Sequence, residues 1–208
     1  MIPPFFIRVT FFFLSICILI EVNRLLQDKP PDSHMVNFID LLTQPDDITC
    51  GPTSAAMLLR YYGKDVEIDK IKKITRTVWF NKGGKDFGMT APELVRRSLQ
   101  HYGLNSFVKY GNLHDLERII CKNNPCIVLL RSGEWNWHYV VVVGYDSEFI
   151  FFANPTNGEI VGLSRSEFYR SWEWSGDMRG NDCSWYVAFW LRALEIYPCS
   201  YVYVDNNI

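Results

Sequence analysis

Apolar and polar residues alternate with a helical period in the first half of the chain. Apolar side chains recur at Ile68, Ile71 and Ile74 with lysines between them, which is the spacing of a helix. Pro52 suits the first turn of a preceding helix, and Gly63 suits its end. The pattern predicts four helices, over residues 50–62, 66–78, 90–102 and 113–120.

The third of these helices carries a start signal of its own. The run Thr90-Ala-Pro-Glu93 has the form of a capping box, in which the threonine and glutamate side chains satisfy the first free amides. Pro92 falls in the first turn, and Gly103 follows the last turn. We therefore expect this helix to begin at Thr90.

The second half of the chain changes to the pattern of strands. Four consecutive valines between Trp137 and Tyr145 are typical of a strand that is buried on both faces. Helices followed by strands predict an α+β domain, with N-terminal helices packed on an antiparallel β-sheet. The strands are expected over residues 126–130, 137–145, 148–153, 160–163 and 185–191, with one more helix over residues 166–174.

The N-terminal residues 1–34 differ from the rest. An uncharged apolar run over residues 9–20 follows Arg8, and it is shorter than the ~20 residues of a bilayer span. Its length suits a signal peptide, yet no small-x-small cleavage site follows, so a removed signal, an uncleaved membrane anchor and a buried helix all stay open. Pro30-Pro31 indicates a linker before one domain over residues 35–208, which we expect to be membrane-anchored or secreted.

Charge and glycine patterns exclude two classes of partner. The chain has 21 Lys plus Arg against 23 Asp plus Glu and no basic run, so it lacks the clustered positive field that binds nucleic acid. The glycine-rich segment 81–88 lacks the spacing of a phosphate-binding loop. We expect no nucleotide there and interpret the segment as a flexible border of a cleft.

Cysteine spacing gives no metal site. The six cysteines form no CxxC pair, and no histidine lies at a zinc-like interval from them, so neither a metal nor a cofactor is expected. Outside the apolar run and apart from Cys50, four remain, which either form two disulfides in an oxidising compartment or stay as buried thiols. These four are Cys121, Cys126, Cys183 and Cys199.

Cys50 lies where a nucleophile would be expected. It stands at the predicted start of a helix, where free backbone N–H groups and the helix dipole stabilise a thiolate and lower the pKa of the thiol from about 8.5. Gly51 leaves room for a substrate backbone to approach. A structural cysteine at a helix start is the alternative interpretation.

A thiol nucleophile needs a histidine and a group that orients it, and the strand pattern supplies both. If two strands turn around residues 146–148, the numbers of paired residues sum to about 292 to 294, so His138 faces residues 154 to 156. Asn154 then lies beside His138 as the orienting amide. Gln44, six residues before Cys50, is near enough to donate a hydrogen bond to an oxyanion, an interaction worth about 3 kcal/mol.

These residues resemble those of the peptidase C39 family, the bacteriocin-processing group of papain-like cysteine proteases, and especially its C39-like branch. The resemblance rests on Gln44 with the run from Cys50 to Met57, on His138-Tyr-Val-Val-Val-Val-Gly-Tyr-Asp, and on Ala153-Asn-Pro. A weaker similarity follows in residues 164–172. It implies a papain-like fold in which Gln44 is the oxyanion donor, Cys50 the nucleophile and His138 the base. The third residue is usually Asp in this family, so Asn154 is a departure that supplies no charge.

The resemblance implies a cysteine-type peptidase that acts on a peptide or protein, in some relatives after a Gly-Gly pair. No Walker motif is present, which predicts a free-standing domain without an ABC exporter in this chain. Two alternatives use the same residues: an acyltransferase of transglutaminase type, and a peptide-binding module without catalysis.

Overall fold

The computed structural model describes residues 29–37, 39–82, 84–131, 137–173 and 199–205. The chain divides into two compact units, Met1–Pro31 and Asp32–Ile208. The second unit contains the helices and strands that follow. The predicted strand over residues 185–191 and the apolar run over residues 9–20 lie outside the described residues.

The described strands of the second unit form a seven-stranded sheet and a separate hairpin. In the sheet the order is β4-β9-β5-β6-β7-β8, with β1 paired to the end of β6, and the pairs are antiparallel. The strands are β1 (His34–Met35), β4 (Ser106–Tyr110), β5 (Cys126–Arg131), β6 (Trp137–Tyr145), β7 (Phe149–Asn154), β8 (Glu159–Ser164) and β9 (Ser200–Val204). The hairpin joins β2 (Val78–Lys82) to β3 (Lys85–Met89).

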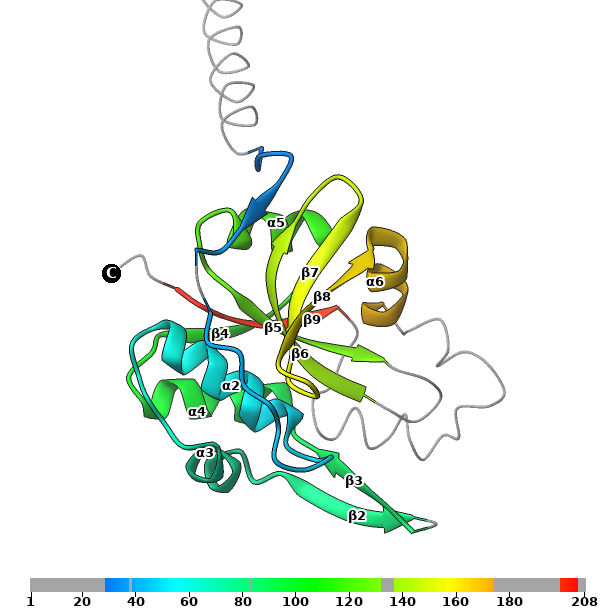
Figure 1. Ribbon diagram of the computed structural model, residues 1–208. Helices are drawn as coiled ribbons and strands as arrows, with labels where there is room; N and C mark the ends of the chain where they lie inside the picture. The colour runs from blue at the N-terminus through cyan, green and yellow to red at the C-terminus, as the bar shows by residue number, and fades with distance from the viewer. Residues whose placement is uncertain (1–28, 38, 83, 132–136, 174–198, 206–208) are drawn as a thin grey trace, which may run out of the picture. The chain divides into compact units, whose positions relative to one another are not determined.

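Helices cover both faces of this sheet. The helices are α2 (Cys50–Tyr61), α3 (Ile68–Thr75), α4 (Pro92–His101), α5 (Leu113–Ile120) and α6 (Arg165–Trp172). Figure 1 shows α2, α3 and α4 grouped together, away from α6. Tyr139 contacts α2, whereas Phe152 and Tyr201 contact α6, and the strand register places Tyr139 on the opposite face from the other two. The α+β class predicted from the sequence is confirmed.

The core is apolar and continuous from α2 to the far face of the sheet. Each of the four valines of β6 is at most 1% exposed, in agreement with the predicted doubly buried strand. On the α6 face, the fully buried Trp172 packs against Phe168 and Tyr201. Its indole N–H donates to the carbonyl oxygen of Ser200 at 3.0 Å, so the one polar atom of the ring is satisfied.

The helix predicted over residues 66–78 is shorter in the structure: α3 ends at Thr75, Arg76 has a left-handed φ of 46°, and Val78 begins β2. The start of α4 also differs from the prediction. The N-cap of α4 is Ala91, without a side-chain cap, so the capping box expected at Thr90 is wrong. The Thr90 hydroxyl instead hydrogen-bonds that of Thr77 at 2.8 Å, and Glu93 pairs with Arg96 in the same helix. These partners draw both side chains away from the helix start. The capping box lies at α5, between Asn112 and Asp115.

Five described strands were not predicted. The glycine-rich segment is part of the β2–β3 hairpin, which turns at Gly84 with φ of 80°. His34, which the sequence placed in a linker, begins β1. The last two are β4 and β9, which pair with each other although about 90 residues separate them in sequence. Within the described part of the chain, no helix is long and apolar enough to cross a membrane.

Candidate active site

Cys50 is the first residue of α2, as the sequence predicted. Thr49 stands at the N-cap but makes no side-chain cap, because its hydroxyl donates to the Asp46 carbonyl oxygen at 3.2 Å. No acidic residue lies in the first turn. The free N–H groups of this turn therefore remain available to an anion at the helix start, whether a thiolate or a substrate oxyanion.

The position of Cys50 at the start of α2 does not by itself lower the pKa of its thiol. The lowered pKa expected from the sequence is therefore wrong. Burial raises the pKa of the Cys50 thiol, and the backbone N–H groups of Tyr139, Gly51 and Cys50 itself offset this only in part. The carboxylate of Asp46 raises the pKa further. Loss of hydration therefore outweighs the helix N-terminus, and formation of a thiolate depends on a proton acceptor.

Tyr139 joins the Cys50 helix to β6. Its backbone N–H lowers the pKa of the Cys50 thiol, and its buried ring packs against Gly51, where an added Cβ would lie 3.1 Å from the ring and 3.3 Å from Thr90. The Tyr139 hydroxyl donates to the Thr90 carbonyl oxygen at 2.7 Å. Because Tyr139 follows His138 directly in β6, this packing brings Cys50 to the part of the strand that carries His138.

His138 and Asn154 are in direct contact. The two residues lie on neighbouring strands, and the distance from His138 Nε2 to Asn154 Oδ1 is 2.8 Å. The numbers of paired residues sum to 294 for Val141 with Ala153, at the end of the hairpin near His138. They sum to 295 near the turn, because a bulge follows Val142. The predicted sum of 292 to 294 therefore holds at the end of the hairpin that carries His138.

Thr156 takes part in this contact; the predicted register included residue 156 among those that face His138, but no role was assigned to it. Its backbone N–H donates to Asn154 Oδ1 at 3.0 Å, and its hydroxyl oxygen lies 3.2 Å from His138 Nε2. Only the oxygen of the Asn154 amide can accept from this N–H, so the amide orientation is fixed. His138 then donates from Nε2–H, which leaves the lone pair of Nδ1 free to accept a proton.

Burial lowers the pKa of the half-buried His138, and the hydrogen bond to Asn154 raises it only in part. The directions for Cys50 and His138 agree, since a raised thiol pKa and a lowered imidazole pKa both favour the neutral pair at rest. A neutral imidazole with a free lone pair at Nδ1 can accept a proton.

Gln44 comes to the same site through the main chain. Its backbone N–H donates to the Pro155 carbonyl oxygen at 2.7 Å, beside Asn154. The side-chain Nε2 donates to the Asp46 carbonyl oxygen at 2.8 Å, which engages one of its two hydrogens. Oε1 is buried and has no hydrogen-bond partner among the described residues.

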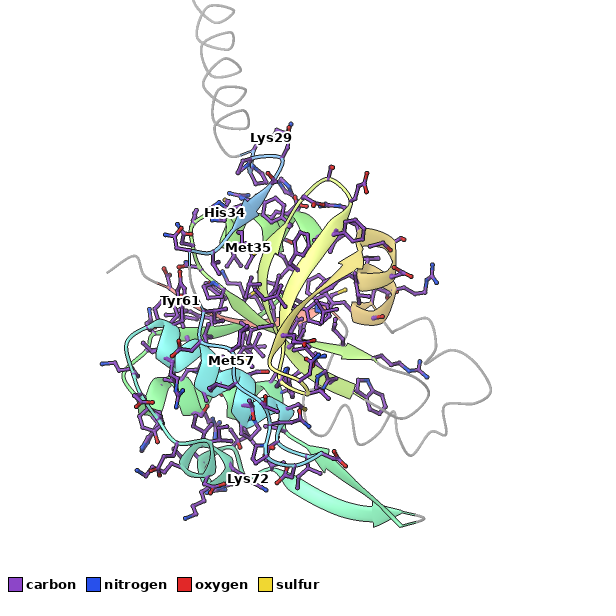
Figure 2. The ribbon with its side chains drawn as sticks, viewed as in Figure 1. Lys29, His34, Met35, Met57, Tyr61 and Lys72 are labelled. Atoms are coloured by element: carbon purple, nitrogen blue, oxygen red, sulfur yellow. The ribbon has the colours of Figure 1, made fainter. Side chains whose placement is uncertain are left out.

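Asp46 organises the loop that leads to Cys50, and sequence reasoning did not identify it. Its side chain accepts from the Ile48 N–H at 3.1 Å and from Lys72 Nζ at 2.7 Å. Burial raises the pKa of Asp46, but the bonds from Lys72, Thr49 and Ile48 outweigh it and the pKa is lowered overall. Lys72, labelled in Figure 2, thus ties this loop to α3.

The other candidate ligands do not gather into a second site. Among the described residues, no group of three His, Cys, Asp or Glu side chains could hold a metal ion. Cys121, Cys126 and Cys199 are free thiols, and Cys126 is fully buried. Cys183 lies outside the described residues. His101 is exposed, and His114 is 55% exposed.

These features define an α+β domain in which Cys50 begins a helix that packs on the strand carrying His138. The sequence profile of the Peptidase_C39 like family matches residues 36–178, more than half of the chain. The chain belongs to the Peptidase_C39 like family, as its motifs predicted.

A curated relative and several solved structures agree with this family. The Lactococcin-G-processing and transport ATP-binding protein LagD of Lactococcus lactis subsp. lactis is 26% identical over 133 residues, or 64% of this chain. That stretch is 17% of LagD, so the chain spans about a sixth of the length of this relative.

The solved structures show the shared fold. A C39-like peptidase from Bacillus anthracis has a TM-score of 0.64 at 14% identity, covering 85% of this chain and 99% of that one. The peptidase domain of Streptococcus ComA, a bi-functional ABC transporter, has a TM-score of 0.55 at 16% identity, with coverage of 80% and 97%. A double glycine motif protease from an AMS/PCAT transporter, solved with its leader peptide, has a TM-score of 0.54 at 19% identity, with coverage of 83% and 95%.

Proposed function

We propose that this protein is a cysteine-type peptidase in which Cys50 is the nucleophile, His138 the base, Asn154 the orienting group and Gln44 an oxyanion donor. The proposal rests on one observation, the partners of two successive residues at the start of β6, His138 and Tyr139. The backbone N–H of Tyr139 stabilises the thiolate form of Cys50, while the preceding residue, His138, is bound through Nε2 by Asn154. A nucleophile, a base and an orienting group in this order are the requirements of acyl transfer through a thioester.

The reaction begins with transfer of the Cys50 proton to Nδ1 of His138. The thiolate attacks the peptide carbonyl carbon, and negative charge develops on the carbonyl oxygen. The free N–H groups of the first turn of α2 and the second hydrogen of Gln44 Nε2 stabilise this charge.

Collapse of the tetrahedral intermediate breaks the C–N bond. The leaving amine takes the proton from His138, and a thioester between Cys50 and the N-terminal part of the substrate remains. His138 then removes a proton from water, which attacks the thioester. The acid product leaves and the thiol is restored with the same proton count.

We propose a substrate with small residues before the cleaved bond, such as a Gly-Gly pair. Gly51 itself is buried against Tyr139 and Thr90, so it serves the packing of α2 on β6 and not, as the sequence suggested, the approach of substrate. The likeness to a double glycine motif protease, with 19% identity, supports the same class of substrate. A small residue beside the reacting carbonyl leaves its backbone free to approach the helix start.

Cleavage of a peptide library by the full-length chain, read by mass spectrometry, tests the proposal. We expect cuts after small residues, loss of all cuts in Cys50→Ala, and a decrease of at least 10³-fold in His138→Ala. Cys121→Ala is the matched control, because it removes another half-buried free thiol and should leave cleavage unchanged. Cuts that persist in Cys50→Ala would refute the assignment of the nucleophile.

The products also separate hydrolysis from transfer. Products should carry oxygen from ¹⁸O-labelled water at the new C-terminus, even with 10 mM glycine amide present. Products that carry glycine amide instead would identify an acyltransferase. Retained binding of a peptide by Cys50→Ala, with no cleavage by the wild type, would identify a binding module.

Membrane association through residues 9–20 is also part of this proposal. The full-length chain should sediment with membranes after alkaline washing, and replacement of Phe12 and Ile16 by Asp should release it. Release of the wild-type chain from the membranes by the alkaline wash would refute a membrane anchor. N-terminal sequencing of the mature protein distinguishes an anchor from a removed signal peptide.

A further inference from the structure

We infer that Thr156 is a positioning residue for His138: its N–H fixes the Asn154 amide and its hydroxyl oxygen is a second acceptor for His138 Nε2–H. The inference rests on the proposed function, because it concerns the same base. Two contacts of one residue carry it, at 3.0 Å to Asn154 Oδ1 and at 3.2 Å to His138 Nε2.

The backbone contact acts on the orientation of the amide. A free Asn side chain can present either O or N to its neighbour, and the two forms have nearly the same shape. With nitrogen toward the ring, Asn154 would donate to Nε2 and favour the Nδ1–H tautomer, which cannot take a proton from Cys50. The Thr156 N–H excludes that form, because it needs an acceptor at the same atom.

The hydroxyl contact acts on the charge of the ring. When Nδ1 takes the Cys50 proton, His138 becomes a cation whose Nε2–H is the donor to Asn154. An amide oxygen supplies a dipole and no charge, so it stabilises the cation less than a carboxylate would. The Thr156 oxygen adds a second dipole at the same hydrogen, and no carboxylate of the described residues bonds to the ring there.

The location of Thr156 suits this role and its test. Thr156 is exposed in the turn between β7 and β8, whereas its neighbour Pro155 is buried and its neighbour Asn154 half-buried. Removal of the hydroxyl should therefore have little effect on stability, within about 0.5 kcal/mol for a surface substitution. Thr156→Val keeps the shape and the backbone N–H, and Thr156→Ser keeps the hydroxyl.

The proposal is tested first by ¹⁵N NMR of the His138 ring, which does not depend on turnover. The His138 signals are identified as those missing in His138→Gln of the full-length chain. We expect the Nε2–H tautomer in the wild type. In Thr156→Val the acid dissociation constant of the His138 imidazolium should rise about 3- to 10-fold, the range of one net hydrogen bond, and in Thr156→Ser by less than about 2-fold. Cys50 and Tyr139 are unchanged in each variant, so their effect on the ring cancels.

Kinetics provide the second measurement. In Thr156→Val, kcat for a cleaved peptide should fall about 3- to 10-fold with KM unchanged, and Thr156→Ser should recover it. Thr156→Val should lower kcat by a larger factor in an Asn154→Ala background, because the Thr156 hydroxyl is then the remaining described partner of His138 Nε2. A role in folding of the turn alone would give the same loss in both backgrounds.

The outcomes separate the inference from the proposed function. His138 signals in Thr156→Val that equal those of the wild type would overturn the inference, even if peptides are cleaved. Changed signals with no cleavage by the wild type would support the positioning role of Thr156 and refute the peptidase. A Nδ1–H tautomer in the wild type would overturn both the amide orientation and the role of Thr156.

Discussion

At the scale of single residues, the site depends on desolvation more than on the helix dipole. Cys50 occupies a helix start with free N–H groups, yet burial raises the pKa of its thiol. The same burial lowers the pKa of His138. Both shifts favour the uncharged pair, so we expect charge to appear during the reaction and not before it.

The pH dependence of kcat/KM follows from the lowered pKa of His138. The base must be neutral, so activity is present above the pKa of His138 and is lost as pH falls through it. Because the pKa is lowered, the acid limb should lie below the ordinary value of about 6.5. Activity toward a fluorogenic peptide between pH 4.5 and 8 measures this limb.

Asn154→Asp provides the matched control for this prediction. A carboxylate beside Nε2 raises the pKa of His138, so the acid limb should move to higher pH in this variant. A wild-type limb at or above pH 6.5 would contradict the lowered pKa of His138.

At the scale of elements, the turn between β7 and β8 aligns the loop of Gln44 with the histidine. Within this turn the Pro155 carbonyl oxygen accepts from the Gln44 N–H, and the Gly158 N–H donates to the Asn154 carbonyl oxygen at 2.9 Å. Gly158 has φ of 66° and lies against Thr43, where an added Cβ would be 2.8 Å from Oγ1. Gly158 therefore allows the turn to form and the loop to pass close to it.

Gly158→Ala should lower both stability and activity. The left-handed conformation costs about 1–2 kcal/mol for a residue with a Cβ, and contact with Thr43 should displace the loop of Gln44 and reduce kcat. Urea unfolding and peptide kinetics measure the two effects. In a Thr43→Ala background, Gly158→Ala should lower kcat by less, while its effect on the free energy of unfolding stays the same. An equal decrease of kcat in both backgrounds would argue against contact of residue 158 with the loop of Gln44.

The capping box of α5 gives a prediction for stability alone. Asn112 accepts from the Asp115 N–H, and the Asp115 carboxylate accepts from the Asn112 N–H at 2.9 Å. Asn112→Ala should cost about 1 kcal/mol in urea unfolding and leave peptide cleavage unchanged. Asn112→Ser keeps a hydrogen-bond acceptor, so its free energy of unfolding should decrease by less. Equal decreases in the two variants would show that the cap contributes little to stability.

At the scale of the whole molecule, β9 joins the edge strand β4 to the rest of the sheet. β9 lies between β4 and β5, which precede it by many residues, and Tyr201, Val202 and Val204 are each at most 4% exposed. α6 also depends on this strand, because Trp172 donates to the Ser200 carbonyl oxygen. The fold is therefore complete only when the last strand has paired.

Deletion of β9 should prevent cooperative folding. A chain that ends at residue 198 leaves β4 and β5 without the strand that joins them and exposes the apolar face that packs on α6. We expect thermal unfolding without a cooperative transition and binding of a hydrophobic dye. A chain that ends at Asp205 keeps β9 and should unfold like the full-length chain; a cooperative transition in the shorter chain would contradict the central role of β9.

Local patterns account for the elements that the sequence predicted well. The predicted bounds of β6 and α5 agree with the structure, because four valines and a polar cap define them without reference to distant residues. The capping box at Thr90 failed because Thr77, from another part of the chain, takes the threonine hydroxyl. β4 and β9 were not predicted because their pairing partners are distant in sequence.

For the site, the sequence indicated the residue types and their order along the chain. The pairing of His138 with Asn154 could be predicted because both lie on one hairpin, whose register is set by a short turn. The lowered pKa of Cys50 was wrong, because burial is a property of the packed molecule. Asp46 and Thr156 were not identified, because their roles depend on contacts that no motif encodes.

By itself, the sequence determined the α+β class, the family, and the candidate residues Gln44, Cys50, His138 and Asn154. Each of these follows from local order along the chain: periodicity, a turn, or a short motif. Only the tertiary structure decided the directions of the pKa shifts of Cys50 and His138, the orientation of the Asn154 amide and the place of β9 in the sheet. These depend on which groups lose water and which hydrogen-bond partners meet, and packing between distant segments settles both.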